Sequence, residues 1–77
     1  MKELLEFLIK NIAGEDFEIK EEELEGGRVN MNVTADPAIV GLIIGKMGKT
    51  VKALRKILSV KAVGEQKSVN IAVSERT

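Results

Sequence analysis

The fold is decided by residues 36–55, which read DPAIVGLIIGKMGKTVKALR. Asp36 can accept a hydrogen bond from a free N–H group and Pro37 suits the first helical position, so a helix of about two turns is predicted from Pro37 to near Ile44. The glycines of Gly45-Lys46-Met47-Gly48 interrupt it. Apolar residues then return at helical spacing and predict a longer second helix with a basic outer face. These apolar residues are Val51, Leu54, Ile57 and Leu58.

The residues on either side predict one more helix and a sheet. Apolar residues near the N-terminus have helical spacing and predict an amphipathic helix of about three turns that ends at Gly14. They are Leu4, Leu5, Leu8, Ile9 and Ile12. Alternation in 17–20 and 28–34 predicts two strands joined by a hairpin turn at Gly26-Gly27, although the glutamates at 21–23 break the first alternation. Val69, Ile71 and Val73 alternate with polar residues and predict a last strand.

The predicted order of elements is α-β-β-α-α-β, within a single domain of residues 1–77. The second and third strands are expected to be parallel, because the two helices between them return the chain to the same end of the sheet. The hairpin makes the first strand antiparallel to the second. The expected fold class is therefore α+β, with a mixed three-stranded sheet and three helices on one face.

The composition argues against several kinds of chemistry. The chain has no cysteine and no histidine, so it lacks thiolate nucleophiles, imidazole bases and the usual zinc ligands. We therefore expect no enzyme activity, no catalytic residue, no metal site and no cofactor. The glutamates within 21–25 do not change this, because neighbouring residues of a strand point to opposite faces. No segment reaches the length of a membrane span and no signal precedes the first helix, so a cytoplasmic protein is expected.

The charges are segregated along the chain, although the formal net charge is zero. Residues 1–27 carry nine acidic residues against three lysines, whereas residues 41–61 carry six basic residues and no acid. A pole of this kind attracts phosphates locally even when the whole molecule is neutral. The basic pole contains the glycine turn.

A Walker A loop is the first of two functional interpretations of these glycines. Gly48-Lys49-Thr50 matches the second half of a Walker A loop, but Ile43 occupies the position of its first glycine, and the turn joins two helices instead of a strand and a helix. A nucleotide-hydrolysing site is therefore disfavoured. The glycines could also form a plain helix–helix turn with no binding function.

The residues Ile44-Gly45-Lys46-Met47-Gly48, flanked by Val40-Gly41 and Val51-Lys52, resemble the signature of KH domains. With the element order and the length, they are similar to the small single-KH bacterial proteins of the KhpA (YlqC) family, of KH type II. The resemblance implies binding of single-stranded RNA between the turn and an aliphatic groove. The implied RNA-binding residues are Gly45, Lys46, Met47 and Gly48 in the turn, Lys49, Lys52 and Arg55 along the second helix, and Val40, Gly41 and Ile44, with Val51 and Leu54, in the groove.

The physics of the turn agrees with this expectation. Glycines allow a nucleic-acid backbone to come close, and the N-terminus of the second helix favours a phosphate. Val40, Ile44, Val51 and Leu54 also have core spacing, and the lysines could form only a solvated face. Met47 could contact a base or another protein.

The resemblance also implies partners. Proteins of this family are expected to be RNA-binding regulators or chaperones with a role in cell-shape regulation, and to form homodimers or heterodimers with a larger KhpB (Jag, EloR)-like protein. The alternative function is thus a protein-interaction module, with dimerisation expected around the turn.

Overall fold

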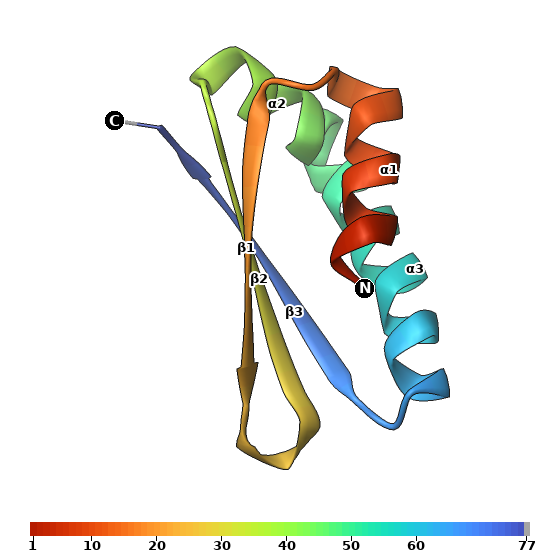
Figure 1. The fold of residues 1–77 in the computed structure, drawn as a ribbon. Coiled ribbons are helices and arrows are strands. Elements are labelled where there is room, and N and C mark those ends of the chain that lie inside the picture. The colour runs from red at the N-terminus through yellow and green to blue at the C-terminus, as the bar shows by residue number, and fades with distance from the viewer. Residues whose placement is uncertain (77) are drawn as a thin grey trace.

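The computed structural model describes residues 1–76 and contains three helices and three strands in the predicted order. They are α1 (Lys2–Ala13), β1 (Phe17–Leu24), β2 (Arg28–Ala35), α2 (Pro37–Ile44), α3 (Lys49–Gly64) and β3 (Ser68–Glu75), with short 3-10 turns at Glu25–Gly27 and Lys46–Gly48. The three helices cover one face of the sheet, as Figure 1 shows. The predicted α+β class with a KH type II order is confirmed.

The sheet has β2 in its centre, in the order β1-β2-β3. β1 is antiparallel to β2, with Phe17 opposite Ala35, and β3 is parallel to β2, with Val69 opposite Val29. Both predicted directions are therefore confirmed. β3 is an edge strand, and α3 packs against it.

The core lies between the central strand and the three helices. The three helices, β2 and β3 contribute buried aliphatic side chains, and burying one such side chain stabilises the fold by roughly 1.5–3 kcal/mol. The cluster comprises Leu5, Ile9, Val29, Met31, Val33, Ile43, Leu54, Leu58 and Ile71. Two residues that helical spacing assigned to the apolar faces, Ile12 and Ile57, are exposed instead.

The chain turns where glycine was expected to permit it. Gly14 ends α1 with a φ of 84°, and Gly26 and Gly27 form the hairpin turn with φ of 78° and 74°. β1 is longer than the alternation predicted, because Glu21 and Glu23 pair with β2 in spite of their charge. Ladder hydrogen bonds are made by the backbone, so an acidic edge strand can continue past the end of its apolar pattern.

The start of α2 differs from the prediction in one respect. Pro37 occupies the first turn as expected, but the Asp36 side chain makes no capping hydrogen bond. Its carbonyl oxygen accepts hydrogen bonds from Ile39 and Val40, and its carboxylate lies 3.8 Å from the Arg76 guanidinium. The charge of Arg76, which follows β3, draws the carboxylate away from the helix.

Within residues 1–76, no helix combines the length and the apolar character needed to cross a membrane.

Candidate nucleic-acid interface

The turn between α2 and α3 is built from backbone in an unusual conformation. Gly45, Met47 and Gly48 all have positive φ, at 75°, 57° and 74°. The Gly45 N–H donates to the carbonyl of Gly41 and closes α2, and the Gly48 N–H donates to the carbonyl of Gly45. The turn is therefore held by its own hydrogen bonds. Met47 is strained there, because a residue with a Cβ disfavours the left-handed region.

The two glycines of the turn are required for different reasons. A Cβ on Gly45 would overlap the side chain of Thr50, so this position needs glycine for space as well as for its φ. A Cβ on Gly48 would meet nothing within 4 Å. Gly48 thus leaves open space at the first turn of α3, which a ligand backbone can use.

The N-terminus of α3 has no internal anion to balance it. No side chain caps the helix, and its first turn contains no acid. Among residues 1–76, the three lysines that surround this end, Lys46, Lys49 and Lys52, take part in no ion pair, and all three are exposed. Together with the helix dipole, they produce a positive potential at the turn.

Arg55 behaves differently from these lysines. Its Nη2 atom lies 3.3 Å from the carbonyl oxygen of Ile71, to which it donates a hydrogen bond. The guanidinium therefore bridges α3 and the free edge of β3. The expectation that Arg55 follows a phosphate backbone along α3 stays a prediction; in the structure its guanidinium reaches the edge of β3.

Some of the residues predicted to line an aliphatic groove are buried in the core. Leu54 is only 2% exposed and belongs to the core, and Val40 and Val51 are also buried. Gly41 and Ile44 are exposed, as a binding surface requires. Leu42, which was not predicted, is the most exposed large aliphatic side chain of α2, at 52%. Leu42 precedes the buried Ile43 and lies 100° from it around the helix, and this step could have identified Leu42 as exposed.

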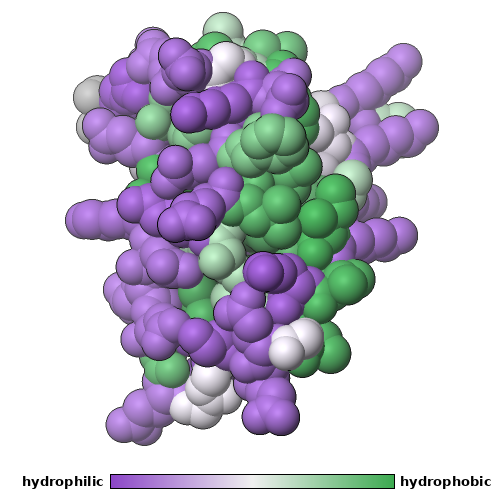
Figure 2. Space-filling view, turned by 45° about the vertical axis from the view of Figure 1, so that its right-hand side comes forward, coloured by the Kyte–Doolittle hydropathy of each residue, from purple (hydrophilic) through white to green (hydrophobic). Residues whose placement is uncertain are grey.

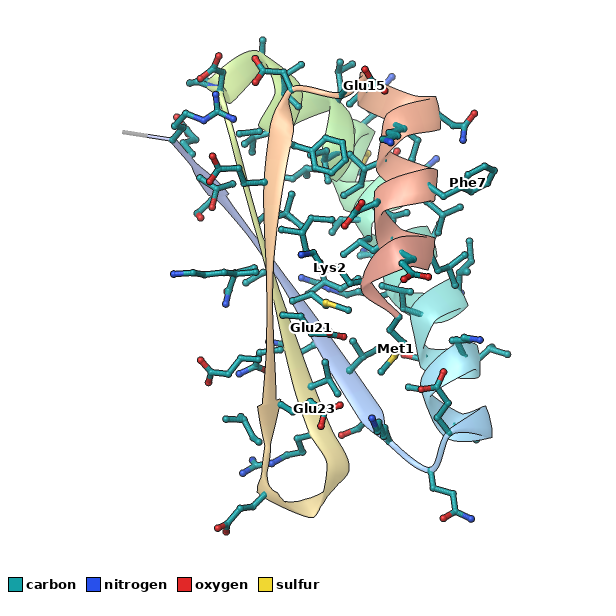
Figure 3. All side chains as sticks on the ribbon, viewed as in Figure 1. Met1, Lys2, Phe7, Glu15, Glu21 and Glu23 are labelled. Carbon is teal, nitrogen blue, oxygen red and sulfur yellow. The ribbon has the colours of Figure 1, made fainter. Side chains whose placement is uncertain are left out.

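A second exposed apolar surface was missed by the sequence prediction. It comprises Phe7 of α1 and Ile57, Val60 and Val63 of α3, and we call it the helix-face patch. Val60 and Val63 are 76% and 74% exposed. Figure 2 shows a continuous apolar strip, flanked by hydrophilic residues, on the side where α1 and α3 lie, and Figure 3 shows Phe7 pointing away from the sheet. The signal in the sequence was that Val60 and Val63, which follow the lysines of α3, are three residues apart and therefore share a helix face.

The acidic part of the molecule is separate from this interface. Glu21 and Glu23 project from β1 (Figure 3), and Glu23 accepts a hydrogen bond of 2.6 Å from Lys67. The hydrogen bond and the charge of Lys67 lower the pKa of Glu23, and the same contacts raise the pKa of Lys67. Within residues 1–76, no three acidic side chains are grouped to hold a metal ion.

A shallow hollow also lies away from the turn, on the first two strands. It is lined by Glu18, Ile19, Lys20, Asn32 and Thr34. A hollow that contains a glutamate and has a single lysine is a poor site for a phosphate chain. The turn and the helix ends beside it are therefore the candidate interface.

Comparison with known proteins agrees with this geometry. The profile of the family described as "KhpA/KhpB, KH domain" matches residues 2–73. The chain is 36% identical over 75 residues to "RNA-binding protein KhpA" of Thermotoga maritima, and 32% identical over 76 residues to the protein of that name from Chlamydia trachomatis. These matches cover 95% and 97% of this chain, and 97% of each relative. The chain belongs to the KhpA/KhpB family of KH domains.

Proposed function

We propose that the protein binds single-stranded RNA through the turn of residues 45–48 and the N-terminal half of α3. The observation that carries the proposal is the uncompensated positive charge of Lys46, Lys49 and Lys52 around an uncapped helix N-terminus. Relatives that align over almost the whole chain carry the name RNA-binding protein.

The turn supplies phosphate contacts in this proposal. Gly48 admits the RNA backbone to the helix end, and Lys46 and Lys49 meet phosphate oxygens as point charges. Four nucleotides are the length that a turn of this kind clamps. Gly41 and Ile44 of α2 then contact the riboses or bases that follow.

Base stacking contributes little to this binding. Phe17 is half-buried on β1, and Phe7 belongs to the helix-face patch on α1. Because neither aromatic ring is in the turn or in the helices beside it, affinity depends on phosphates and aliphatic contacts. We expect weak, salt-dependent binding without catalysis, by a regulator or chaperone that acts in the cytoplasm. The role in cell-shape regulation stays a prediction.

The helix-face patch favours a second function, binding of another KH protein. A strip of exposed aliphatic side chains and a phenylalanine is typical of a protein contact. The occupant is a second copy of the chain or a KhpB-like partner. Pairing two KH domains would raise the avidity for one RNA without new contacts. The dimer contact expected at Met47 is less well supported, because Met47 stands alone in the turn.

The test is a titration of a labelled single-stranded RNA at several salt concentrations. Lys46→Asp/Met47→Asp places two acids where phosphates should bind, and Lys10→Asp/Asn11→Asp makes the same charge change on α1. We expect the first variant to lose binding and the second to bind like the wild type. The wild-type log–log salt slope should be about −0.7 for each phosphate contact.

Two outcomes would overturn the RNA proposal: binding that does not depend on salt, and binding that is equally strong in both variants. Sedimentation of each variant is a necessary control, because loss of a dimer would also lower the apparent affinity. Circular dichroism shows whether each variant is folded.

A further inference from the structure

We infer that the free edge of β1 binds an extended, basic segment of another protein, which adds to the sheet as a fourth strand. The inference concerns the acidic side of the molecule and does not depend on RNA binding at the turn. Two features select the partner: backbone groups that face an open edge, and acidic side chains on both sides of them.

The direction of the backbone groups of β1 is the first argument. The Arg76 N–H donates to the Ala35 carbonyl, so the backbone of Ala35 faces β3, and Phe17 opposite it forms a pair without hydrogen bonds. Such pairs alternate along an antiparallel ladder, so every second residue after Phe17 points its N–H and C=O groups to the free edge. These residues are Ile19, Glu21 and Glu23. Within residues 1–76 no other element bonds these groups.

The form of this edge is the second argument. Sheet edges are commonly protected by a proline, a bulge, a very short strand or a covering element. β1 has eight residues, contains no proline and pairs with β2 residue by residue from Phe17 to Leu24, without a bulge. Figure 1 shows β1 in front of the other two strands, with the helices on one side of the sheet. The charge of β1 is therefore the feature that decides which strand can add.

The charge along the edge is the third argument. Odd-numbered residues of β1 lie on the helix side of the sheet and even-numbered residues on the open side, and both sides carry acids. Glu18, Glu21 and Glu22 are exposed and take part in no ion pair within residues 1–76. Opposite charges on adjacent strands attract, and like charges directly opposite repel. A basic strand is therefore favoured, and the acidic β1 of a second copy is disfavoured.

The hollow on the first two strands lies beside this edge, on the open side of the sheet. It has a volume of about 210 Å³ and contains the free carboxylate of Glu18. Long side chains reach diagonal neighbours across a sheet, so an arginine or lysine of the added strand can extend to Glu18, with Asn32 and Thr34 as further acceptors. Lys20 also lines the hollow, which therefore accepts one cation and not several.

The chain itself does not supply a strand of this kind. Its basic residues at 46–61 lie in the turn and in α3, and a helical backbone is not free to join a ladder. β3 of a second copy has a free edge, but Ser68–Glu75 contains no lysine or arginine. The occupant is therefore a segment of a different protein. Consecutive lysines or arginines in it would meet acids on both sides of the sheet.

The experiment uses a fluorescein-labelled peptide of nine residues, with arginines at the three central positions and alternating threonine and valine on either side. Fluorescence anisotropy measures its Kd for the protein without RNA. One control peptide has glutamates at the central positions. A second keeps the arginines but is N-methylated at the three central amides, so it has the same charge and cannot donate to a ladder.

Two pairs of protein variants test the two features of the edge. Glu18→Lys/Glu22→Lys reverses charge on β1, and Glu3→Lys/Glu75→Lys makes the same change at exposed acids elsewhere, which form no ion pair within residues 1–76. Glu21→Gln removes an acid. Glu21→Pro also removes an N–H that faces the free edge, while the bonds to β2 remain.

We expect the wild type to bind the basic peptide about 10-fold or more tightly than either control peptide. Glu18→Lys/Glu22→Lys should weaken binding by about 3-fold to 30-fold, because attractions become repulsions. Glu3→Lys/Glu75→Lys should bind like the wild type. Glu21→Gln should weaken binding by about 1.5-fold to 5-fold, and Glu21→Pro should weaken it further.

Equal affinity for the basic and the N-methylated peptide would overturn the inference, because charge would then attract the peptide without strand addition. Equal binding by the two double-lysine variants, or no binding of the basic peptide, would overturn it as well. So would self-association of the wild type that Glu18→Lys/Glu22→Lys abolishes in sedimentation, since a second copy would then occupy the edge. The N-methylated peptide leaves the protein unchanged, so it serves if Glu21→Pro does not fold.

Discussion

The two halves of α3 bury the same kind of side chain and expose opposite kinds. Towards the sheet, both halves present apolar residues, and these are Val51, Leu54, Leu58 and Ala62. Towards solvent, the N-terminal half presents Lys49, Lys52 and Lys56, whereas the C-terminal half presents Val60 and Val63 beside one lysine, Lys61, which is paired with Glu65. Folding requires only the inner face to be apolar, so the outer face is free to specify contacts.

This division separates the two proposed functions along one rigid element. Lys49 and Val60 are 11 residues apart, which is about 16 Å along the helix axis. RNA at the turn and a protein on the helix-face patch can therefore be bound at the same time. A pair of chains joined through the patch would carry two turns in one particle, which raises avidity.

Placing acids on the outer face of either half of α3 is expected to have the largest effect. Lys49→Glu/Lys52→Glu should weaken RNA binding by roughly 10-fold to 100-fold, because two phosphate contacts become repulsions. Val60→Asp/Val63→Asp should abolish self-association or capture of a KhpB-like protein, because acids would be buried in an apolar contact. Lys49→Glu/Lys52→Glu should leave the association unchanged, and Val60→Asp/Val63→Asp should keep the RNA affinity of a single domain without the gain from avidity. Anisotropy and sedimentation of both variants measure this, and a loss of both functions in either variant would contradict the separation.

The turn that begins the basic half allows a sharper comparison, between its two glycines. Gly45→Ala should lower the free energy of unfolding by about 2 kcal/mol or more, because the new Cβ adds an overlap with Thr50 to the strain of positive φ. Gly48→Ala should lower it by about 1–2 kcal/mol, from strain alone. Urea unfolding measures both. Equal losses would show that the space around Gly45 can relax.

These two glycines illustrate how far the sequence predicts this structure. The Gly-x-x-Gly spacing predicted the turn, because positive φ is a local property of glycine. Asp36-Pro37 and the apolar spacing after the turn predicted its neighbouring helices. The glycine spacing did not predict that a Cβ on Gly45 would overlap Thr50 whereas a Cβ on Gly48 would meet open space. That difference depends on the direction in which α3 leaves the turn. The element order and the strand directions were also predictable, because they follow from local patterns of apolar residues and turns.

The candidate site was predicted less completely. The lysines of the turn are exposed as expected, because charged side chains stay in water. Leu54 is in the core and Ile57 is exposed, because both lie near the border of the apolar face of α3, where helical spacing decides little. The Arg55 hydrogen bond to Ile71 could not be predicted, since it joins residues 16 positions apart through tertiary packing.

Gly41 offers a smaller test in which stability and binding should change in opposite directions. A Cβ at this position would meet nothing within 4 Å, so packing inside the chain does not require glycine in the middle of α2. Gly41→Ala should raise the free energy of unfolding by about 0.5–1 kcal/mol. If RNA approaches this surface, the same variant should bind RNA several-fold more weakly. A variant that is more stable and binds normally would place the RNA away from α2.

The smallest expected effect is a pH dependence limited to the apolar end of α3. Lys67 follows this end, its N–H donates to the Ala62 carbonyl, and its amino group holds Glu23 of β1. The hydrogen bond and the charge of Lys67 lower the pKa of Glu23 below its ordinary value of 4.5. The contact therefore stabilises the fold fully above pH 4.5, and the stabilisation is lost as the pH falls through the lowered pKa.

Because Glu23 is exposed and Lys67 is partly exposed, the effect should be slight and should decrease with salt. Hydrogen exchange followed as the pH falls should show faster opening at residues 62–68 than at the turn, after correction for the intrinsic rate. Glu23→Gln should remove this difference, whereas Glu22→Gln, on the same strand but outside the ion pair, should keep it. Equal acceleration at the turn and at residues 62–68 would mean that α3 opens as one unit, so that its two halves differ in their contacts and not in their stability.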